Sequence, residues 1–183
     1  MRLGMTDRSI PFDIPTIETD RLILRAHTLD DFEDCAAMWG DETVTRHIGG
    51  RPFAPGDVWA RLLRYTGHWA HLGYGFWAIE DRESGKFAGE CGFADFKRDL
   101  VPSLDGMPEI GWALAVWAQG RGVATEAIRA AVEWGDAHFD AGTRTSCMID
   151  PDNLASIRVA EKCGYEEFAR TEYRGTPTIL YRR

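Results

Sequence analysis

The sequence predicts an α+β fold: a mostly antiparallel, mixed sheet of about seven strands with helices on both faces. Two observations predict this class. Short apolar runs bounded by turn residues alternate with segments whose apolar residues recur at helical spacing. One strand–helix–strand unit has the order of a parallel crossover, whereas hairpin turns join other neighbouring strands.

The first part of the chain supplies one strand and two helices. Residues 21–27 form an apolar strand flanked by arginines, and Thr28 is a suitable N-cap for a helix that ends at Gly40. Residues 41–56 contain two adjacent glycines and two prolines, so we expect irregular structure there. Apolar side chains then recur at helical spacing over about 57–71, and Gly73 suits the end of that helix.

The second part begins with a hairpin. Residues 76–80 and 87–96 are apolar strands separated by a polar turn that contains Gly85. A longer polar loop over 97–108 follows. Strands are then predicted at 110–116, 143–149, 165–173 and 178–181, with a helix at 122–138 and another at 154–163.

The length of 183 residues fits one domain with a single core. We assign this domain to 18–183 and expect residues 1–17 to be a poorly ordered leader. There is no internal repeat or linker that divides the chain.

Composition excludes several classes of protein. Hydrophobic residues make up 44% and charged residues 27%, which is typical of a folded globular chain. No apolar run approaches the roughly 18 residues of a membrane span, and the N-terminus lacks the apolar core of a signal peptide. We therefore expect a cytoplasmic protein with no membrane partner.

Net charge is −8, which argues against nucleic acid as a partner. It is compatible with a cationic substrate, although a solvated acidic surface is the commoner reason for such a value. A polyanionic ligand would have to be held by local positive potential.

Cysteine and histidine spacing gives no metal site. The four cysteines show no zinc-type or redox spacing, so buried core thiols are expected. His68 and His71 lack a third ligand nearby in the sequence.

The loop over 119–122, between the strand at 110–116 and the helix at 122–138, is the strongest functional signal. A glycine-containing loop that enters a helix leaves backbone N–H groups unpaired at the positive end of the helix dipole. Gly120 and Gly122 let the backbone approach a ligand closely, so the loop predicts a site for a pyrophosphate. The pattern lacks the third glycine of a dinucleotide-binding loop and the Gly-Lys-Ser/Thr of a Walker loop.

Gln119-x-x-Gly122-x-Ala124 matches the pyrophosphate loop of the GNAT acyltransferases at every defined position. The chain most resembles their RimJ/RimL subgroup of N-acetyltransferases. Similar stretches occur in order at Glu18–Arg25, Gly89–Phe93, Glu109–Trp112 and Asn153–Tyr165, so the resemblance covers about residues 18–182.

The resemblance implies acetyl-CoA as the donor co-substrate, without a metal. It implies that backbone N–H groups of the loop and first helical turn hold the pyrophosphate and that the strand end pairs with the pantetheine arm. The implied cofactor-binding residues are Leu114, Ala115, Val116, Gln119, Gly120, Arg121, Gly122, Val123, Ala124, Thr125, Asn153 and Ser156.

Amide formation from a thioester needs a base for the amine and a proton for the leaving thiolate. Glu109 matches an acidic position that resembling enzymes use as the base, and the alternative is a solvated charge at a strand end. Ser156 is the candidate proton donor, since Ala160 stands where many family members have tyrosine; local backbone bonding is its alternative role. Asn153 is expected to be a helix N-cap and is also a candidate contact to the pantetheine, and backbone N–H groups near Val116 are candidates for the oxyanion site.

The resemblance implies a primary amine as the acceptor; a protein N-terminal α-amine, a small amine and an antibiotic all stay open, and the net charge slightly favours a cationic one. Candidate wall residues, each also suited to the core, are Trp39, Trp69, Phe93, Trp112 and Tyr173. Two alternatives stay open: a non-catalytic acyl-CoA sensor or structural subunit, and a homodimer formed through a sheet edge.

Overall fold

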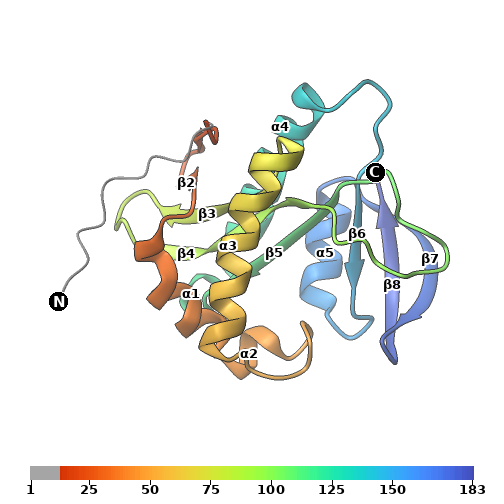
Figure 1. Cartoon of the computed structure of the whole chain (residues 1–183), viewed down its shortest axis with the longest axis horizontal. Helices are drawn as coiled ribbons and strands as arrows, with labels where there is room; N and C mark the ends of the chain where they lie inside the picture. The colour runs from red at the N-terminus through yellow and green to blue at the C-terminus, as the bar shows by residue number, and fades with distance from the viewer. Residues whose placement is uncertain (1–12) are drawn as a thin grey trace.

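The computed structural model describes residues 13–183 and contains one eight-stranded sheet (Figure 1). The strand order is β1-β2-β3-β4-β5-β6-β8-β7, and all neighbours are antiparallel except β5 and β6. The mixed α+β fold with a mostly antiparallel sheet is therefore confirmed. The strands are β1 (Ile17–Glu18), β2 (Leu22–Arg25), β3 (Phe76–Asp81), β4 (Phe87–Ala94), β5 (Glu109–Leu114), β6 (Ser146–Ile149), β7 (Glu166–Tyr173) and β8 (Thr176–Arg182).

Helices cover both faces of this sheet, as expected. They are α1 (Phe32–Trp39), α2 (Glu42–Thr45), α3 (Pro55–Leu72), α4 (Val123–His138) and α5 (Leu154–Lys162). Short 3₁₀ turns precede α1 at Leu29–Asp31 and follow β5 at Val116–Ala118. None of the helices in residues 13–183 is long and apolar enough to cross a membrane.

The face covered by α4 holds the larger core. One hydrophobic cluster joins this helix to the strands. It contains the fully buried Ala127, Ile128 and Ala131 of α4 together with Phe93 of β4 and Ile110 of β5. The small alanines let the helix lie close to the strands, which is what the apolar spacing predicted.

The opposite face is covered by α1 and α3. Val58 and Leu62 of α3 pack in one cluster with Ala78 of β3 and Ala113 of β5. In Figure 1, α3 runs across the face of the central strands. The side chains of Glu90 and Glu109 lie on this same face.

Several predicted boundaries were wrong: the strand expected over 143–149 begins at Ser146, and the strand expected over 87–96 ends at Ala94. Two further differences have clear local reasons. The segment expected to be irregular contains the one-turn helix α2, whose N-cap Asp41 accepts a hydrogen bond from the N–H of Thr43 at 2.7 Å. A single turn is too short to show a helical period. The strand predicted over 110–116 ends at Leu114, because the chain turns into a 3₁₀ helix in which Ala118 N–H donates to the carbonyl of Ala115 at 2.9 Å.

The leader expected over residues 1–17 lies largely outside the described residues. Within the described part, Ile14 and Ile17 pack against the core, and the carbonyl of Pro15 accepts a hydrogen bond from Trp77 Nε1 at 2.8 Å. All four cysteines are buried and free, as predicted for core thiols.

A partly buried ion pair fixes the connection from β2 to α1. The two terminal guanidinium nitrogens of Arg25 donate to the carboxylate of Asp31 at 2.8 and 2.9 Å, and the N–H of Thr28 donates to Asp31 at 2.7 Å. Burial opposes ionisation of Asp31, but the hydrogen bonds from Arg25 and Thr28 outweigh it and hold its pKa below the ordinary value.

We predict that Asp31→Asn lowers the free energy of unfolding by about 2 kcal/mol at pH 7. Because the folded pKa of Asp31 is lowered, this contribution is complete above the unfolded pKa of about 3.9 and is lost as the pH falls through the folded value. Urea unfolding at pH 7 and pH 3 measures both effects, with the exposed neighbour change Asp30→Asn as control. An Asp31→Asn deficit that is equally large at pH 3 would contradict this account.

Candidate functional site

The loop between β5 and α4 has the geometry of an anion site. Gly120 and Gly122 have φ of 72° and 79°, in the left-handed region that favours glycine. Gly122 is the N-cap of α4 and offers no capping side chain, and the first intrahelical bond is made by the N–H of Glu126 at 3.1 Å. The N–H groups of Val123, Ala124 and Thr125 therefore lack intrahelical partners at the positive end of the helix.

A carboxylate in the first turn of α4 would repel an anion, but this one is neutralised. Glu126 accepts hydrogen bonds from Arg21 Nε at 2.7 Å and from the Thr19 hydroxyl at 2.6 Å. Burial raises the pKa of Glu126, yet Thr19 and Arg21 lower it by more, so it stays ionised and paired. Arg21 also donates to the carbonyl of Arg121 at 3.0 Å, which ties the β1–β2 turn to the loop.

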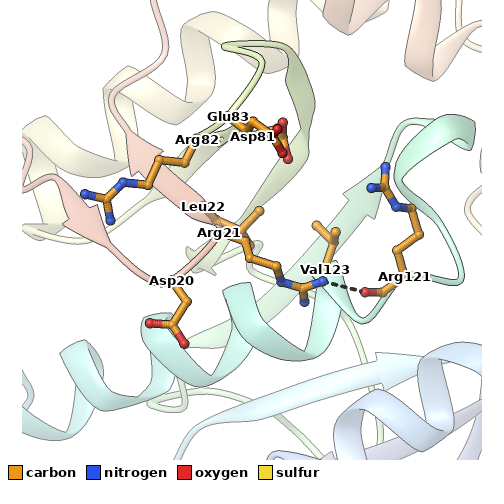
Figure 2. A pocket seen from close by; sticks show the side chains of 8 residues that line it. All are labelled: Asp20, Arg21, Leu22, Asp81, Arg82, Glu83, Arg121 and Val123. Atoms are coloured by element: carbon orange, nitrogen blue, oxygen red, sulfur yellow. Dashed lines mark hydrogen bonds between the residues drawn. The ribbon is translucent and has the colours of Figure 1, made fainter.

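A small pocket lies beside this loop (Figure 2). Its volume is about 330 Å³, and its lining includes the guanidinium groups of Arg21, Arg82 and Arg121 together with the carboxylates of Asp81 and Glu83. The mixed charges give no strong overall field. Arg121 is exposed, and its guanidinium carbon is 5.9 Å from the ring centroid of Trp117.

The sheet opens between β5 and β6. These parallel strands share only one residue pair, Glu109 with Ser146, at their first residues. The N–H of Ala115 donates to Ala88 on the β4 side at 2.9 Å, so the backbone groups of Leu114 point the opposite way, into the opening. The side chain of Gln119 donates to the carbonyl of Leu114 at 3.0 Å. Of the predicted stretch Leu114 to Val116, only Leu114 is in the strand, since Val116 begins the 3₁₀ turn.

Glu109 stands at the closed end of this opening and is buried. Its two carboxylate oxygens accept hydrogen bonds from Arg98 Nε and Nη2 at 2.6 and 2.7 Å. Burial lowers the pKa of Arg98, but the pairing with Glu109 outweighs it and the pKa is raised overall. Glu109 is thus not a solvated strand-end charge, and each of its oxygens keeps a second lone pair beside the hydrogen bond from Arg98.

The start of α5 follows the other end of β6. Asn153 Oδ1 accepts the N–H of Ser156 at 3.1 Å, which confirms Asn153 as the N-cap. The local bond between a side chain and the backbone at this helix start is therefore made by the side chain of Asn153, with Ser156 contributing its backbone N–H. Ser156 is half-buried in the first turn, and Ala160 is fully buried. Glu109 lies beside Ser146, the first residue of β6, whereas Ser156 comes after Ile149, the last residue of β6. The two candidate catalytic residues are thus positioned by opposite ends of this strand.

A family model described as an acetyltransferase (GNAT) domain matches residues 21–166 of the chain. The chain belongs to the GNAT acetyltransferase family. Among curated relatives, the Bacillus subtilis protein YkkB, which is uncharacterized, is 36% identical over 177 residues, covering 90% of this chain and 93% of YkkB.

Solved structures agree with this assignment. A protein of Bordetella pertussis assigned to the GnaT family is 32% identical, with a TM-score of 0.81 over 93% of this chain and 99% of that chain. An acetyltransferase from Agrobacterium tumefaciens is 26% identical, with a TM-score of 0.80 over 94% of this chain and 95% of its own.

Two more distant structures share the fold. RimL, a ribosomal L7/L12 α-N-protein acetyltransferase in complex with coenzyme A, is 16% identical with a TM-score of 0.72, over 92% and 97% of the two chains. Spermidine N-acetyltransferase from Vibrio cholerae, in complex with CoA and spermine, is 16% identical with a TM-score of 0.71, over 90% and 96%.

The aromatic residues proposed as walls lie in three places in this GNAT domain. Trp69 and Phe93 are buried in the α4-side core, and Trp112 is half-buried against it. Trp39 is buried on the α3 side. Tyr173 is half-buried, and the guanidinium carbon of Arg98, which pairs with Glu109, lies 5.0 Å from its ring centroid.

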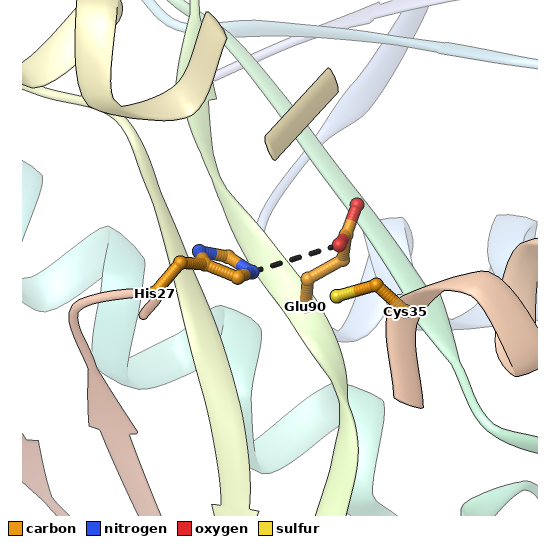
Figure 3. A group of neighbouring side chains, drawn as sticks. All are labelled: His27, Cys35 and Glu90. Carbon is orange, nitrogen blue, oxygen red and sulfur yellow. Dashed lines mark ion pairs between the residues drawn. The ribbon is translucent and has the colours of Figure 1, made fainter. Parts of the chain in front are cut away.

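Sequence reasoning missed a buried polar cluster around Glu90 of β4. Glu90 is 1% exposed and accepts hydrogen bonds from the Tyr65 hydroxyl and, at 3.2 Å, from Trp39 Nε1. His27 Nε2 lies 3.6 Å from its second oxygen, and Cys35 is adjacent (Figure 3). Burial and the Glu90 charge raise the pKa of Tyr65, so its hydroxyl stays protonated as a donor. A lone glutamate in the apolar run over 87–94 was the available signal.

The ligand atoms of His27, Cys35 and Glu90 lie within 4.8 Å of one another, and these residue types can bind metal. These three residues could therefore hold a metal ion, and the expectation that the protein needs no metal stays a prediction.

We predict that Gly122→Ala lowers the free energy of unfolding by about 1–2 kcal/mol, because an alanine is strained at φ of 79°. The control is Gly67→Ala in α3, where a Cβ meets nothing within 4 Å. That change should instead raise stability by about 0.5–1 kcal/mol, since alanine favours the helix. Chemical unfolding of both variants tests the pair, and equal effects would contradict the left-handed geometry of the loop.

Proposed function

We propose that this GNAT domain is an acetyl-CoA-dependent N-acetyltransferase that moves the acetyl group to a primary amine by direct attack on the thioester. The observation that carries the proposal is the open edge of β5 leading from the uncapped N-terminus of α4 to the buried carboxylate of Glu109. One end offers an anion site, the middle offers unpaired backbone groups, and the other end offers a candidate base.

The donor would lie along this opening. Backbone N–H groups from Gly120 to Thr125 would hold the pyrophosphate, with Arg121 close by. The pantetheine arm would pair with β5 as an added strand, where Gln119 already holds the carbonyl of Leu114. The complexes of RimL and of the V. cholerae enzyme with coenzyme A support this assignment by shared fold.

The reaction needs a base for the ammonium group and a proton for the leaving thiolate. Glu109 removes one proton from the ammonium form directly or through water, the neutral amine attacks the thioester carbon, and the C–S bond breaks as the nitrogen loses its second proton to solvent. An α-amine has a pKa of about 7.7–8.0 and a lysine amine about 10.4, so a base is needed at neutral pH. Ser156 would give the leaving thiolate a proton, and solvent would then restore the serine.

The acceptor class follows from the RimJ/RimL resemblance and stays broad. That subgroup acts on protein N-termini, while the V. cholerae neighbour is a spermidine acetyltransferase. The engagement of Glu109 by Arg98 is the observation that would suit a non-catalytic acyl-CoA-binding protein. Turnover separates the two functions.

Thiol release from acetyl-CoA, measured across N-terminal peptides, amino acids and polyamines, tests the proposal. We expect release that depends on an amine acceptor and yields the N-acetylated product. Tight binding of acetyl-CoA without turnover of any amine would contradict the enzyme and favour the sensor.

We predict that Glu109→Gln lowers kcat by about 10²–10⁴-fold while leaving the affinity for acetyl-CoA near normal. The charge-matched control is Glu133→Gln, an exposed position on α4, which should leave kcat unchanged. Steady-state kinetics with a verified acceptor provide the test, and an unchanged kcat in Glu109→Gln would remove Glu109 as the base.

For Ser156→Ala we expect a smaller loss of kcat than for Glu109→Gln, below about 10²-fold. Water can replace a serine as donor to a thiolate, which limits the effect. An unaltered kcat would assign protonation of the thiolate to solvent.

A further inference from the structure

Three arginines gather on the α3 side of the sheet; we call them the arginine cluster (Arg61, Arg64 and Arg98). The guanidinium carbon of Arg61 is 4.1 Å from the ring centroid of Trp39 and 5.0 Å from that of Phe53. Its Nη1 donates to the hydroxyl of Tyr65 at 3.3 Å. The aromatic rings hold this group in a fixed position while leaving donors unused.

The other two arginines share an aromatic ring. The guanidinium carbons of Arg64 and Arg98 lie 5.2 and 4.6 Å from the ring centroid of Phe96. Arg98 in turn forms the fork with Glu109. Arg64 is therefore separated from the proposed base by one aromatic ring and one guanidinium.

The charges of this region do not balance. Arg98 is paired with Glu109, and Arg61 is linked to Glu90 through the Tyr65 hydroxyl. Within residues 13–183, Arg64 forms no ion pair, so one positive charge is in excess. Arg64 is exposed at the surface, so a ligand can reach its guanidinium. Partial desolvation of the group and then the charge of Arg61 lower its pKa. An excess positive charge in a chain of net charge −8 indicates a local site for an anion.

The cluster faces the end of the sheet where the reaction is proposed. Glu90 is opposite Ala113 and Ala94 is opposite Glu109, so the side chains of Glu90 and Glu109 point to the same face of the sheet. That face is the one covered by α3, which carries Arg61 and Arg64.

We propose that the arginine cluster binds an anionic group of the acceptor, so that the substrate is an amine bearing a carboxylate or a phosphate near its nitrogen. This inference rests on the proposed acetyl transfer and specifies its acceptor. Guanidinium groups match the geometry of both anions with paired hydrogen bonds. A polycationic amine would be repelled by the excess charge, which reverses the slight expectation drawn from the net charge of the whole chain.

The test compares kcat/KM, at a pH corrected for the pKa of each amine, for pairs of amines in which one member carries the anion and the other does not. One pair is an α-amino acid and its amide, a second is O-phosphoethanolamine and ethanolamine, and a third is a peptide beginning with aspartate and one beginning with asparagine. We expect the anionic member of at least one pair to be favoured by about 10–100-fold. The preferred pair distinguishes carboxylate from phosphate.

Substitutions in the full chain test whether the preference for anionic amines comes from the arginine cluster. Arg64→Gln should reduce the anionic-to-neutral ratio by about tenfold, and Arg64→Lys should retain part of it. Arg129→Gln removes the same charge from α4 on the opposite face and should leave the ratio unchanged. Because the ratio compares two substrates in one preparation, it does not depend on the fraction of protein that is active.

Each contrary outcome has a definite meaning. Equal or better use of the neutral amines would overturn this inference and leave the acetyl transfer intact. A strong anionic preference that survives in both Arg61→Gln and Arg64→Gln would also overturn it, because other residues would then bind the anion. Acetyl-CoA binding with no turnover of any amine would overturn the proposed function and this inference together.

Discussion

The separation of β5 from β6 is the constraint on which the site depends. The two strands share one residue pair, Glu109 with Ser146, and then diverge while the rest of the sheet stays hydrogen-bonded. Unpaired backbone groups are costly unless they find a partner, so this edge is prepared for an extended ligand. The divergence also sets the order of the parts: the glycine loop and α4 follow the open end of β5, and the buried carboxylate lies at the closed end.

Local electrostatics oppose the overall charge of the molecule at two places. At the N-terminus of α4, Arg21 neutralises Glu126, so the unpaired N–H groups of the helix are not offset by a free carboxylate. On the α3 side, three guanidinium groups meet two carboxylates. Under the two proposals, a protein with a net charge of −8 would hold a polyanionic donor at one end of the opening and an anionic group of the acceptor at the other. The Arg98–Glu109 fork couples the second region to the proposed chemistry.

Sequence reasoning succeeded where a pattern has one physical solution. The alanine-rich face of α4 and the left-handed glycines of its loop were both predictable, because helical spacing and positive φ leave strong local signals. Asn153 was likewise predictable as a cap. The site charges were not: Glu90, Tyr65 and Arg98 come from separate elements, and only the tertiary fold joins them. Arg98 lies in the irregular loop over 97–108, so no periodic pattern in the sequence predicts that it pairs with Glu109.

Amide hydrogen exchange of the wild-type protein, with and without acetyl-CoA, tests the central claim most directly, namely that the donor occupies the β5–β6 opening with its pyrophosphate on α4. The account predicts that acetyl-CoA slows exchange at the backbone of 112–116 and 120–126 and leaves the outer strand β7 unchanged. Protection confined to other segments, or unchanged exchange at both stretches while acetyl-CoA is bound, would contradict it.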